Sequence, residues 1–218
     1  MTSSISLWGY VSAHYPQLIF DSYQHVSAVI QSVLIATVLG VAIGVLTYRN
    51  AVAANLAMAT SSVILTVPAF ALLGLLIPLF GLGVIPSVAA LVLYSLLPIV
   101  RNTIVGLNGV DPALTDAARG IGMSRLTTLT RVELRLVWPA ILSAMRLSTQ
   151  MSMGVLAIAA YVKGPGLGNL IFAGLARVGS PTALPMALTG TLLIVILALA
   201  LDAVLVLIGR LTTSKGIR

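Results

Sequence analysis

Residues 111–141 read DPALTDAARGIGMSRLTTLTRVELRLVWPAI, and they interrupt a chain that is otherwise almost free of charge. Of the 17 charged side chains, 12 Lys and Arg and 5 Asp and Glu, seven fall within residues 108–139. The runs on either side are long and apolar. Because a charged side chain is costly to place in hydrocarbon, this stretch predicts a water-exposed loop between membrane spans.

The overall composition indicates a membrane protein. Of the 218 residues, 59% are hydrophobic and 8% are charged, whereas a soluble domain has about 45–50% apolar and about 25% charged residues. The mean hydropathy is +1.09. The chain has no cysteine, which excludes disulfides and thiol chemistry. Its net charge of +7 comes from Lys and Arg at the edges of apolar runs, so we predict no nucleic-acid binding.

Five charge-poor runs are long enough to cross a bilayer, which takes about 20 apolar residues. We predict spans over residues 26–48, 54–79, 86–106, 139–162 and 183–208. Pro68 and Pro78 are expected to bend or end the second span. Residues 163–182 are rich in Gly and Pro, and they predict a re-entrant or interfacial segment. The predicted fold class is an all-α polytopic membrane protein with about five transmembrane helices.

The Lys and Arg residues predict the orientation. If the charged loop is cytoplasmic, ten of them lie inside and only Lys163 and Arg177 lie outside. The positive-inside rule then places the N-terminus outside and the C-terminus inside. The expected organisation is an extracytoplasmic or interfacial segment (1–25), a transmembrane domain (26–211) with its loop at 108–138, and a cytoplasmic tail (212–218).

The loop has the pattern of two short helices joined by a glycine turn. Asp111 is a good N-cap and Pro112 a good first residue for a helix that ends at Gly120 or Gly122. Ser124 is placed to cap a second helix. In that helix three apolar residues recur at a spacing of three and predict a docking stripe: Leu126, Leu129 and Val132. The loop contains no His, no Cys and no carboxylate pair, so we expect no catalytic residue and no metal site.

This loop resembles the EAA loop of type I ABC importer permeases. That family's pattern is Glu-Ala-Ala, then a glycine, then Ile/Val-x-Leu-Pro. The corresponding residues here are Asp116-Ala117-Ala118, Gly122 and Val132-Glu133-Leu134. Asp116 stands where Glu is usual and Arg135 where Pro is usual, with Pro139 four residues further on. The residues that the resemblance and the pattern assign to ATPase coupling are Asp116, Ala117, Ala118, Gly120, Gly122, Leu126, Leu129, Val132 and Leu134.

The wider chain, about residues 26–211, is similar to the quaternary-amine osmoprotectant branch of that family, whose solutes are glycine betaine, carnitine and choline. The similar stretches are TVPAFALLGLLIPLFGLG (66–83), GIGMSRLTTLTRVEL (120–134) and GPGLGNLIFAGL (164–175). The resemblance implies a type I importer permease fold in the bacterial cytoplasmic (inner) membrane. It also implies three kinds of protein partner: a second permease subunit, identical or homologous, cytoplasmic ATPase subunits under the loops, and an extracytoplasmic solute-binding protein.

The chain has no GxxxxGK[ST] phosphate-binding loop. The glycines at 164, 166 and 168 are not followed by Lys-Ser or Lys-Thr. We therefore expect that this chain is not an enzyme and binds no cofactor, and that ATP is used by a partner subunit.

Aromatic side chains are candidates for a solute pathway, because aromatic cages bind trimethylammonium groups through cation–π contacts. The candidates are Phe70, Tyr94 and Tyr161, with packing in the core or against lipid as the alternative for each. Asp202 lies inside the last predicted span and is a functional candidate. The alternative is that it pairs with an arginine such as Arg146.

Two smaller features leave their roles open. Ala36, Gly40 and Gly44 are spaced by four and predict close helix packing, either within one subunit or across a dimer. His14 and His25 are expected to be polar residues of the membrane interface.

The predicted function is the permease subunit of an ATP-driven importer of an osmoprotectant. One alternative is an importer permease for another small solute, such as an amino acid or methionine. A stand-alone secondary transporter would favour midplane carboxylates or an internal repeat, and neither is evident in the sequence. A simple membrane anchor would not need a bent second span or a glycine-rich outer segment.

Overall fold

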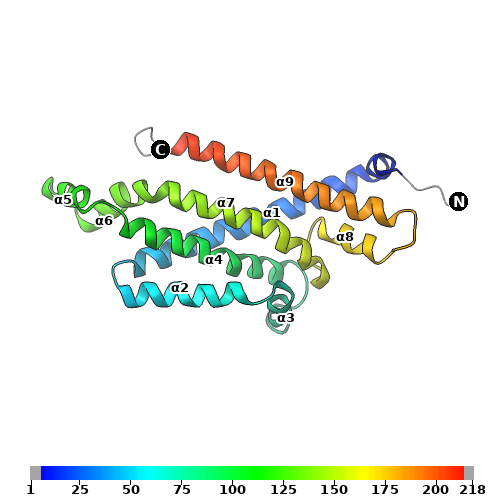
Figure 1. The fold of residues 1–218 in the computed structure, drawn as a ribbon, viewed down its shortest axis with the longest axis horizontal. Coiled ribbons are helices and arrows are strands. Elements are labelled where there is room, and N and C mark those ends of the chain that lie inside the picture. Colours follow the sequence, from blue (N-terminus) through cyan, green and yellow to red (C-terminus); the bar gives the residue numbers. More distant parts are fainter. Residues whose placement is uncertain (1–5, 214–218) are drawn as a thin grey trace.

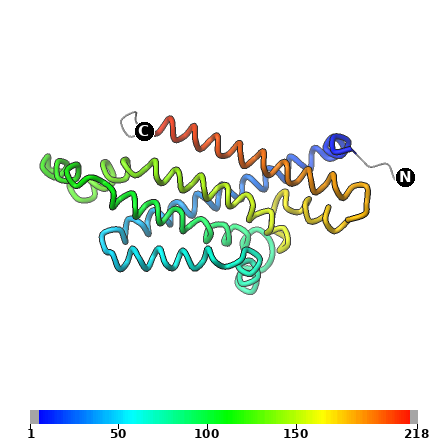
Figure 2. Tube along the Cα trace, in the orientation of Figure 1, coloured from blue at the N-terminus to red at the C-terminus, as the bar shows by residue number. Residues whose placement is uncertain are grey.

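The computed structural model describes residues 6–213, and within them every regular element is a helix (Figures 1 and 2). The first five residues of the predicted outer segment lie outside this range, as do Lys215, Arg218 and most of the predicted tail. The elements are α1 (Leu7–Thr47), α2 (Ala51–Thr66), α3 (Ala69–Phe80), α4 (Val84–Asn108), α5 (Pro112–Gly120), α6 (Arg125–Thr128), the π-helical turn η1 (Leu129–Glu133), α7 (Leu134–Ala159), the 3-10 turn η2 (Ala160–Val162), α8 (Gly168–Leu175) and α9 (Ala183–Thr212).

The predicted number of spans agrees with the structure. Four helical runs are long and apolar enough to cross a membrane: α1, α4, the run Arg125–Val162 and α9. The pair α2 and α3 passes the same test together and makes a fifth span if the pair is counted as one. The fold class predicted from the charge pattern, an all-α polytopic membrane protein, is therefore confirmed.

Helix α1 is longer than predicted. It begins at Leu7 rather than near residue 26, and it continues through Pro16 for 41 residues in all. At about 1.5 Å per residue it is roughly 60 Å long, about twice the thickness of the hydrocarbon core. The extra turns are held by burial, because Tyr10 and Leu18 pack against two other buried residues, Leu170 and Met186. Contacts with such distant residues produce no periodic pattern within residues 1–25, so the sequence does not predict the early start of α1.

The second predicted span is two helices, bent by 100° between α2 and α3. Pro68 is the N-cap residue of α3, so the predicted break at this residue is confirmed. Proline has no N–H and disfavours a helical residue before it, which ends α2 at this point. The hydroxyl of Tyr94 in α4 donates a hydrogen bond to the carbonyl of Val67 at the bend. Pro78 does not break α3, which continues to Phe80.

Helix α4 is at the centre of the bundle and packs against α1, α2, α3 and α7. Its contact with α1 is tight, because a Cβ atom on Gly40 would lie 2.7 Å from Ile99 Cγ2, and one on Gly44 would lie 2.5 Å from Thr103 Cγ2. The predicted close packing of the small residues is thus a contact within one subunit. It joins α1 and α4 at two positions about one helical turn apart.

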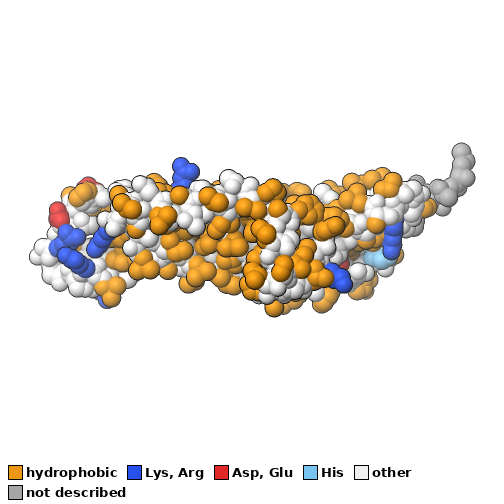
Figure 3. Space-filling view, turned by 90° about the horizontal axis from the view of Figure 1, so that it is seen from below, with side chains coloured by type: hydrophobic (Ala, Val, Ile, Leu, Met, Phe, Trp, Pro, Cys, Tyr) orange, Lys and Arg blue, Asp and Glu red, His pale blue; other side chains and the backbone are white. Residues whose placement is uncertain are grey.

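One end of the bundle carries most of the charge. Figure 1 shows α5, α6, the turn between α1 and α2 and the last turn of α9 at the same end, whereas α1 begins and α8 lies at the other. We call the end that carries α5 and α6 the loop end. In the space-filling view of one face, several Lys and Arg side chains gather there, and the middle of the bundle is mainly hydrophobic (Figure 3).

An ion pair joins α7 to α9 within the apolar part of the bundle. Arg146 Nε lies 2.7 Å from Asp202 Oδ1, and the second guanidinium nitrogen donates to Oδ2 at 2.9 Å. Both carboxylate oxygens are therefore bound in a two-pronged pair, which is the strong form of this interaction. The structure thus has the Arg146 pairing, given above as the alternative to a functional role for Asp202.

We expect Asp202→Ala to lower the free energy of unfolding by about 2–4 kcal/mol, because it leaves the Arg146 charge without its partner beside lipid. Thermal unfolding of the purified protein in nanodiscs measures this loss. The control is the double variant Arg146→Leu with Asp202→Leu, which removes both charges and should recover most of the stability. An Asp202→Ala protein with wild-type stability would contradict a structural role for the pair.

Candidate functional site

The candidate site begins with the first helix of the loop, α5, which forms as predicted. Asp111 is its N-cap, and the Asp111 carboxylate accepts a hydrogen bond from the backbone N–H of Ala113 at 2.9 Å. Pro112 occupies the first helical position, where its missing N–H leaves no hydrogen bond unmade. Local sequence is therefore sufficient to start this helix.

Helix α5 ends in a Schellman motif with Gly122 at the left-handed position. The N–H of Gly122 donates to Arg119 O at 2.9 Å, and the N–H of Met123 donates to Ala118 O at 3.1 Å. Gly122 has φ = 85°, a conformation that costs other residues on the order of 1–2 kcal/mol. A Cβ atom at this position would meet no atom of the chain within 4 Å, so a larger side chain would project away from the protein. The predicted glycine turn is confirmed.

The second helix of the loop is continuous with the fourth predicted span. Ser124 caps it through a 3.3 Å hydrogen bond from the N–H of Thr127, as predicted. The helix then passes through the π turn η1 directly into α7. The helix that contains the fourth predicted span therefore begins well before Pro139, which lies inside α7. The sequence did not reveal this because the charges of Arg131 and Arg135 indicated a loop.

The structure separates the residues predicted for the docking stripe. Leu126 is 70% exposed, whereas Leu129 and Leu134 pack against the main hydrophobic core and Val132 is half-buried. The π turn shifts the helix faces, so a spacing of three does not give one stripe here. Two further apolar residues of the loop, neither of them predicted above, are also exposed: Leu114 within α5 and Ile121 at its C-cap. We call Leu114, Ile121 and Leu126 the apolar tip.

The Asp-Ala-Ala residues lie on α5 with different exposure. Ala118 is buried, and Asp116 and Ala117 are exposed. The Asp116 carboxylate lies 3.5 Å from the guanidinium of Arg119, one helical turn later. Exposed pairs of this kind contribute little to stability. Gly120 is the last residue of α5 and has open space around it.

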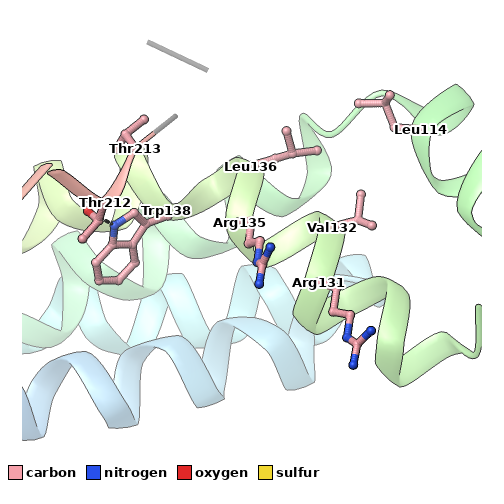
Figure 4. Close-up of a pocket in the computed structure, with 8 residues that line it drawn as sticks. All are labelled: Leu114, Arg131, Val132, Arg135, Leu136, Trp138, Thr212 and Thr213. Carbon is pink, nitrogen blue, oxygen red and sulfur yellow. Dashed lines mark hydrogen bonds between the residues drawn. The ribbon is translucent and has the colours of Figure 1, made fainter. Parts of the chain in front are cut away.

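A cavity of about 500 Å³ opens beside the loop, between α5, the start of α7 and the end of α9. Figure 4 shows Arg131 and Arg135 on one side of the helix, with Leu136 and Val132 directed to the other. The indole N–H of Trp138 donates to Thr212 Oγ1 at 2.7 Å. This bond joins α7 to the last turn of α9 at the loop end.

Glu133 is the main polar residue that the sequence analysis misplaced. The sequence predicts that its charge belongs to a water-exposed loop, but Glu133 is 3% exposed. Tyr48 Oη donates to Glu133 Oε2 at 2.8 Å, Arg49 Nε donates to Tyr48 Oη at 2.7 Å, and an Arg49 terminal nitrogen lies 3.5 Å from Glu133 Oε1. Burial, followed by the Glu133 carboxylate, raises the pKa of Tyr48, so its hydroxyl remains protonated. The available sequence signal for the burial of Glu133 was its position between two apolar residues of the motif, Val132 and Leu134.

The aromatic candidates fall into two places. Phe70 and Tyr161 meet edge to face, with ring centroids 5.4 Å apart, and Phe172 lies 6.3 Å from Tyr161. Phe70 and Tyr161 are 50% and 70% exposed. Tyr94 is buried in the core, bound to the α2–α3 bend, and is not part of this group. We call Phe70, Tyr161 and Phe172 the aromatic cluster; Phe172 was not among the predicted pathway residues.

The glycine-rich segment before α8 folds against α1. Asn169 Nδ2 donates to the carbonyls of Gly164 and Gly166 at 2.9 and 3.0 Å, which closes the turn. A Cβ atom on Gly166 would lie 2.7 Å from His25 Cβ. His25 is fully buried, with Nε2 3.1 Å from the carbonyl of Met153. His25 is therefore enclosed by the protein rather than exposed to the surroundings of the bundle. Among residues 6–213 no group of His, Cys, Asp and Glu is arranged to hold a metal ion.

Comparison with known proteins identifies the family. The osmoprotectant import permease protein OsmW of Salmonella typhimurium is 41% identical over 90% of this chain and 92% of its own length. The choline transport system permease protein OpuBB of Bacillus subtilis is 34% identical over 93% of this chain and 91% of its own length. Among solved structures, an inward-facing MetNI methionine ABC transporter matches with a TM-score of 0.77 at 21% identity, covering 88% of this chain and 94% of the matched chain.

The structural likeness at this identity shows the fold, and the sequence relatives show the family. Residues 36–214 match the family described as binding-protein-dependent transport system inner membrane component, a family of transport subunits rather than enzymes. This range includes the charged loop, the π turn and the aromatic cluster. The chain is therefore a multi-pass inner-membrane protein that belongs to the binding-protein-dependent ABC transporter permease family.

Proposed function

We propose that this chain is one permease subunit of an ATP-driven importer whose solute is a quaternary-amine osmoprotectant. The observation that carries the proposal is the 41% identity to an osmoprotectant import permease, which extends over nine-tenths of both chains. A choline permease matches over a similar range. The likeness to a methionine transporter concerns the fold alone, and one fold serves many solutes.

The loop end has the features expected of an ATPase docking surface. The apolar tip exposes Leu114, Ile121 and Leu126, and burial of such surface contributes about 25 cal/mol per Å². The Schellman turn at Gly122 joins α5 to α6 at the outer edge of the loop end (Figure 1). We infer that a cytoplasmic ATPase subunit binds the tip and uses the ATP, and that this chain binds no cofactor itself.

The opposite end has features suited to a solute. Quaternary ammonium groups bind to aromatic ring faces. Phe70, Tyr161 and Phe172 meet at this end, and Phe70 and Tyr161 are exposed while Phe172 is half-buried. We propose that the aromatic cluster borders the solute pathway and that Tyr94 contributes by holding the α2–α3 bend. A second permease subunit, identical or homologous, completes the pathway, and an extracytoplasmic binding protein delivers the solute.

Uptake by the assembled complex tests the proposed function. Permease, ATPase and binding protein reconstituted in liposomes should take up glycine betaine, choline or carnitine only when ATP is inside. The negative control is a complex whose ATPase subunit cannot hydrolyse ATP. Uptake of methionine with none of the three osmoprotectants would overturn the substrate assignment. Uptake by the permease alone would overturn the ATP-driven mechanism.

Gly122→Leu is expected to reduce uptake at least tenfold, because it strains the turn by on the order of 1–2 kcal/mol and projects a bulky side chain toward the ATPase. Recovery of the ATPase subunit on permease pull-down should fall with it. The matched control is Gly179→Leu, since Gly179 also has positive φ and open space but lies between α8 and α9. That variant should retain the ATPase subunit. Wild-type capture and uptake by Gly122→Leu would exclude the loop as the coupling element.

We propose that the loop end is cytoplasmic, which agrees with the Lys and Arg count. The absence of native cysteine in the chain allows single-cysteine labelling. Ile121→Cys, at a residue 77% exposed, should not react with a membrane-impermeant maleimide added to intact spheroplasts. Val178→Cys, at a residue 81% exposed, should react. The reverse pattern would invert the proposed topology.

A further inference from the structure

Glu133 lies where the loop meets helix α7, and its carboxylate is bound to a different part of the chain. Its partners, Tyr48 and Arg49, form the turn between the end of α1 at Thr47 and the start of α2 at Ala51. Tyr48 is separated from Glu133 by 85 residues in sequence. The contact therefore joins the segment that follows the apolar tip to the first helical hairpin of the fold.

The arrangement buries a carboxylate group between the loop and the α1–α2 turn. A buried carboxylate is stabilised only by good partners, and an apolar residue in its place is often as stable or more so. The Glu133 side chain is 4% exposed, whereas the Arg49 side chain is 49% exposed. The pair thus has one member inside the protein and one at the surface, bridged by the Tyr48 hydroxyl. We infer a role for this link in addition to stability.

The π turn η1 directs Glu133 inward. The N–H of Leu134 bonds to Leu129 O, five residues back, so one additional residue is accommodated in this turn. One residue rotates the following helix face by about 100°. Glu133 consequently faces the α1–α2 turn, while Arg131 and Arg135 on either side are exposed. Turns of this type are rare and occur frequently at functional sites.

We propose that Glu133 is a positioning residue for coupling, which rests on the proposed ATP-driven import: the Glu133–Tyr48–Arg49 link carries displacement of the loop to the α1–α2 turn. The turn directly follows α1, and α1 packs tightly on α4 through Gly40 and Gly44. A displacement received at the turn is therefore passed to the α1–α4 pair at the centre of the bundle. The loop acts on α7 directly and on α1 through this link.

The test uses the reconstituted complex with three permease variants: Tyr48→Phe, Glu133→Leu and the two combined. The measured quantities are solute imported per ATP hydrolysed, ATPase capture and unfolding temperature. Tyr23→Phe is the matched control, because it makes the same change within α1, the helix that Tyr48 caps, at a residue 69% exposed. A second readout is a spin label at Val52→Cys, an exposed position in the first turn of α2, followed on addition of ATP and vanadate.

The Tyr48→Phe complex should import about tenfold less solute per ATP, because the substitution removes one hydrogen bond to a charged group and a tenfold change corresponds to the contribution of such a bond. Glu133→Leu should lose at least as much, and the double variant should lose no more than Glu133→Leu because both changes break one link. The double variant leaves no buried charge, so its unfolding temperature and ATPase capture should match wild type. Tyr23→Phe should import the wild-type amount per ATP.

The proposal is overturned if the stable double variant imports as much solute per ATP as wild type. A failure of the proposed function gives a different result, namely a wild-type complex that hydrolyses ATP but imports none of the osmoprotectants. In that case the spin label at position 52 tests the proposed link independently of solute import. Loss of its response to ATP and vanadate in the double variant supports the link, and an unchanged response overturns it. Tyr48→Phe removes a single hydroxyl, so it provides the same comparison if Glu133→Leu fails to assemble.

Discussion

Hydrocarbon offers no hydrogen-bond partner to a backbone amide and no solvation to a charge, and the rest of this structure follows from that constraint. The backbone satisfies itself in long helices, and most of the charged side chains lie toward the ends of the bundle. Where a helix must break inside the apolar region, the freed group needs a donor. At the α2–α3 bend the Tyr94 hydroxyl donates to the free carbonyl of Val67. Tyr94, a candidate for the solute pathway, therefore stabilises the bend.

The same constraint explains the polar contacts within and beside the spans. Arg146 and Asp202 lie on different helices and neutralise each other through two hydrogen bonds. Glu133 is buried at the border between loop and span, and it is bound by a tyrosine and an arginine from the α1–α2 turn. A polar contact is selective because few partners satisfy it. Each of these pairs therefore holds two particular elements together, whereas apolar packing alone permits many neighbours.

At the loop end, exposed residues are available to a partner, and buried residues bond to other parts of the same chain. The apolar tip presents Leu114, Ile121 and Leu126 outward, where a partner can cover them. Glu133 and Trp138 face other helices of the same chain through hydrogen bonds to Tyr48 and Thr212. A surface for a partner and two connections to separate helices thus lie within one short stretch. This arrangement suits a segment that receives a movement and distributes it to the spans.

The sequence by itself determined the membrane class, the number of spans, the glycine turn at Gly122 and the family, because these depend on local composition, caps and motif spacing. Asp111, Pro112 and Ser124 were placed correctly for the same reason. Tertiary structure decided what depends on distant partners. The start of α1 is stabilised by Leu170 and Met186, His25 is buried under the turn at Gly166, and Glu133 is turned inward by a π turn that has no periodic signature. A long-range contact contributes free energy that no local window of sequence contains.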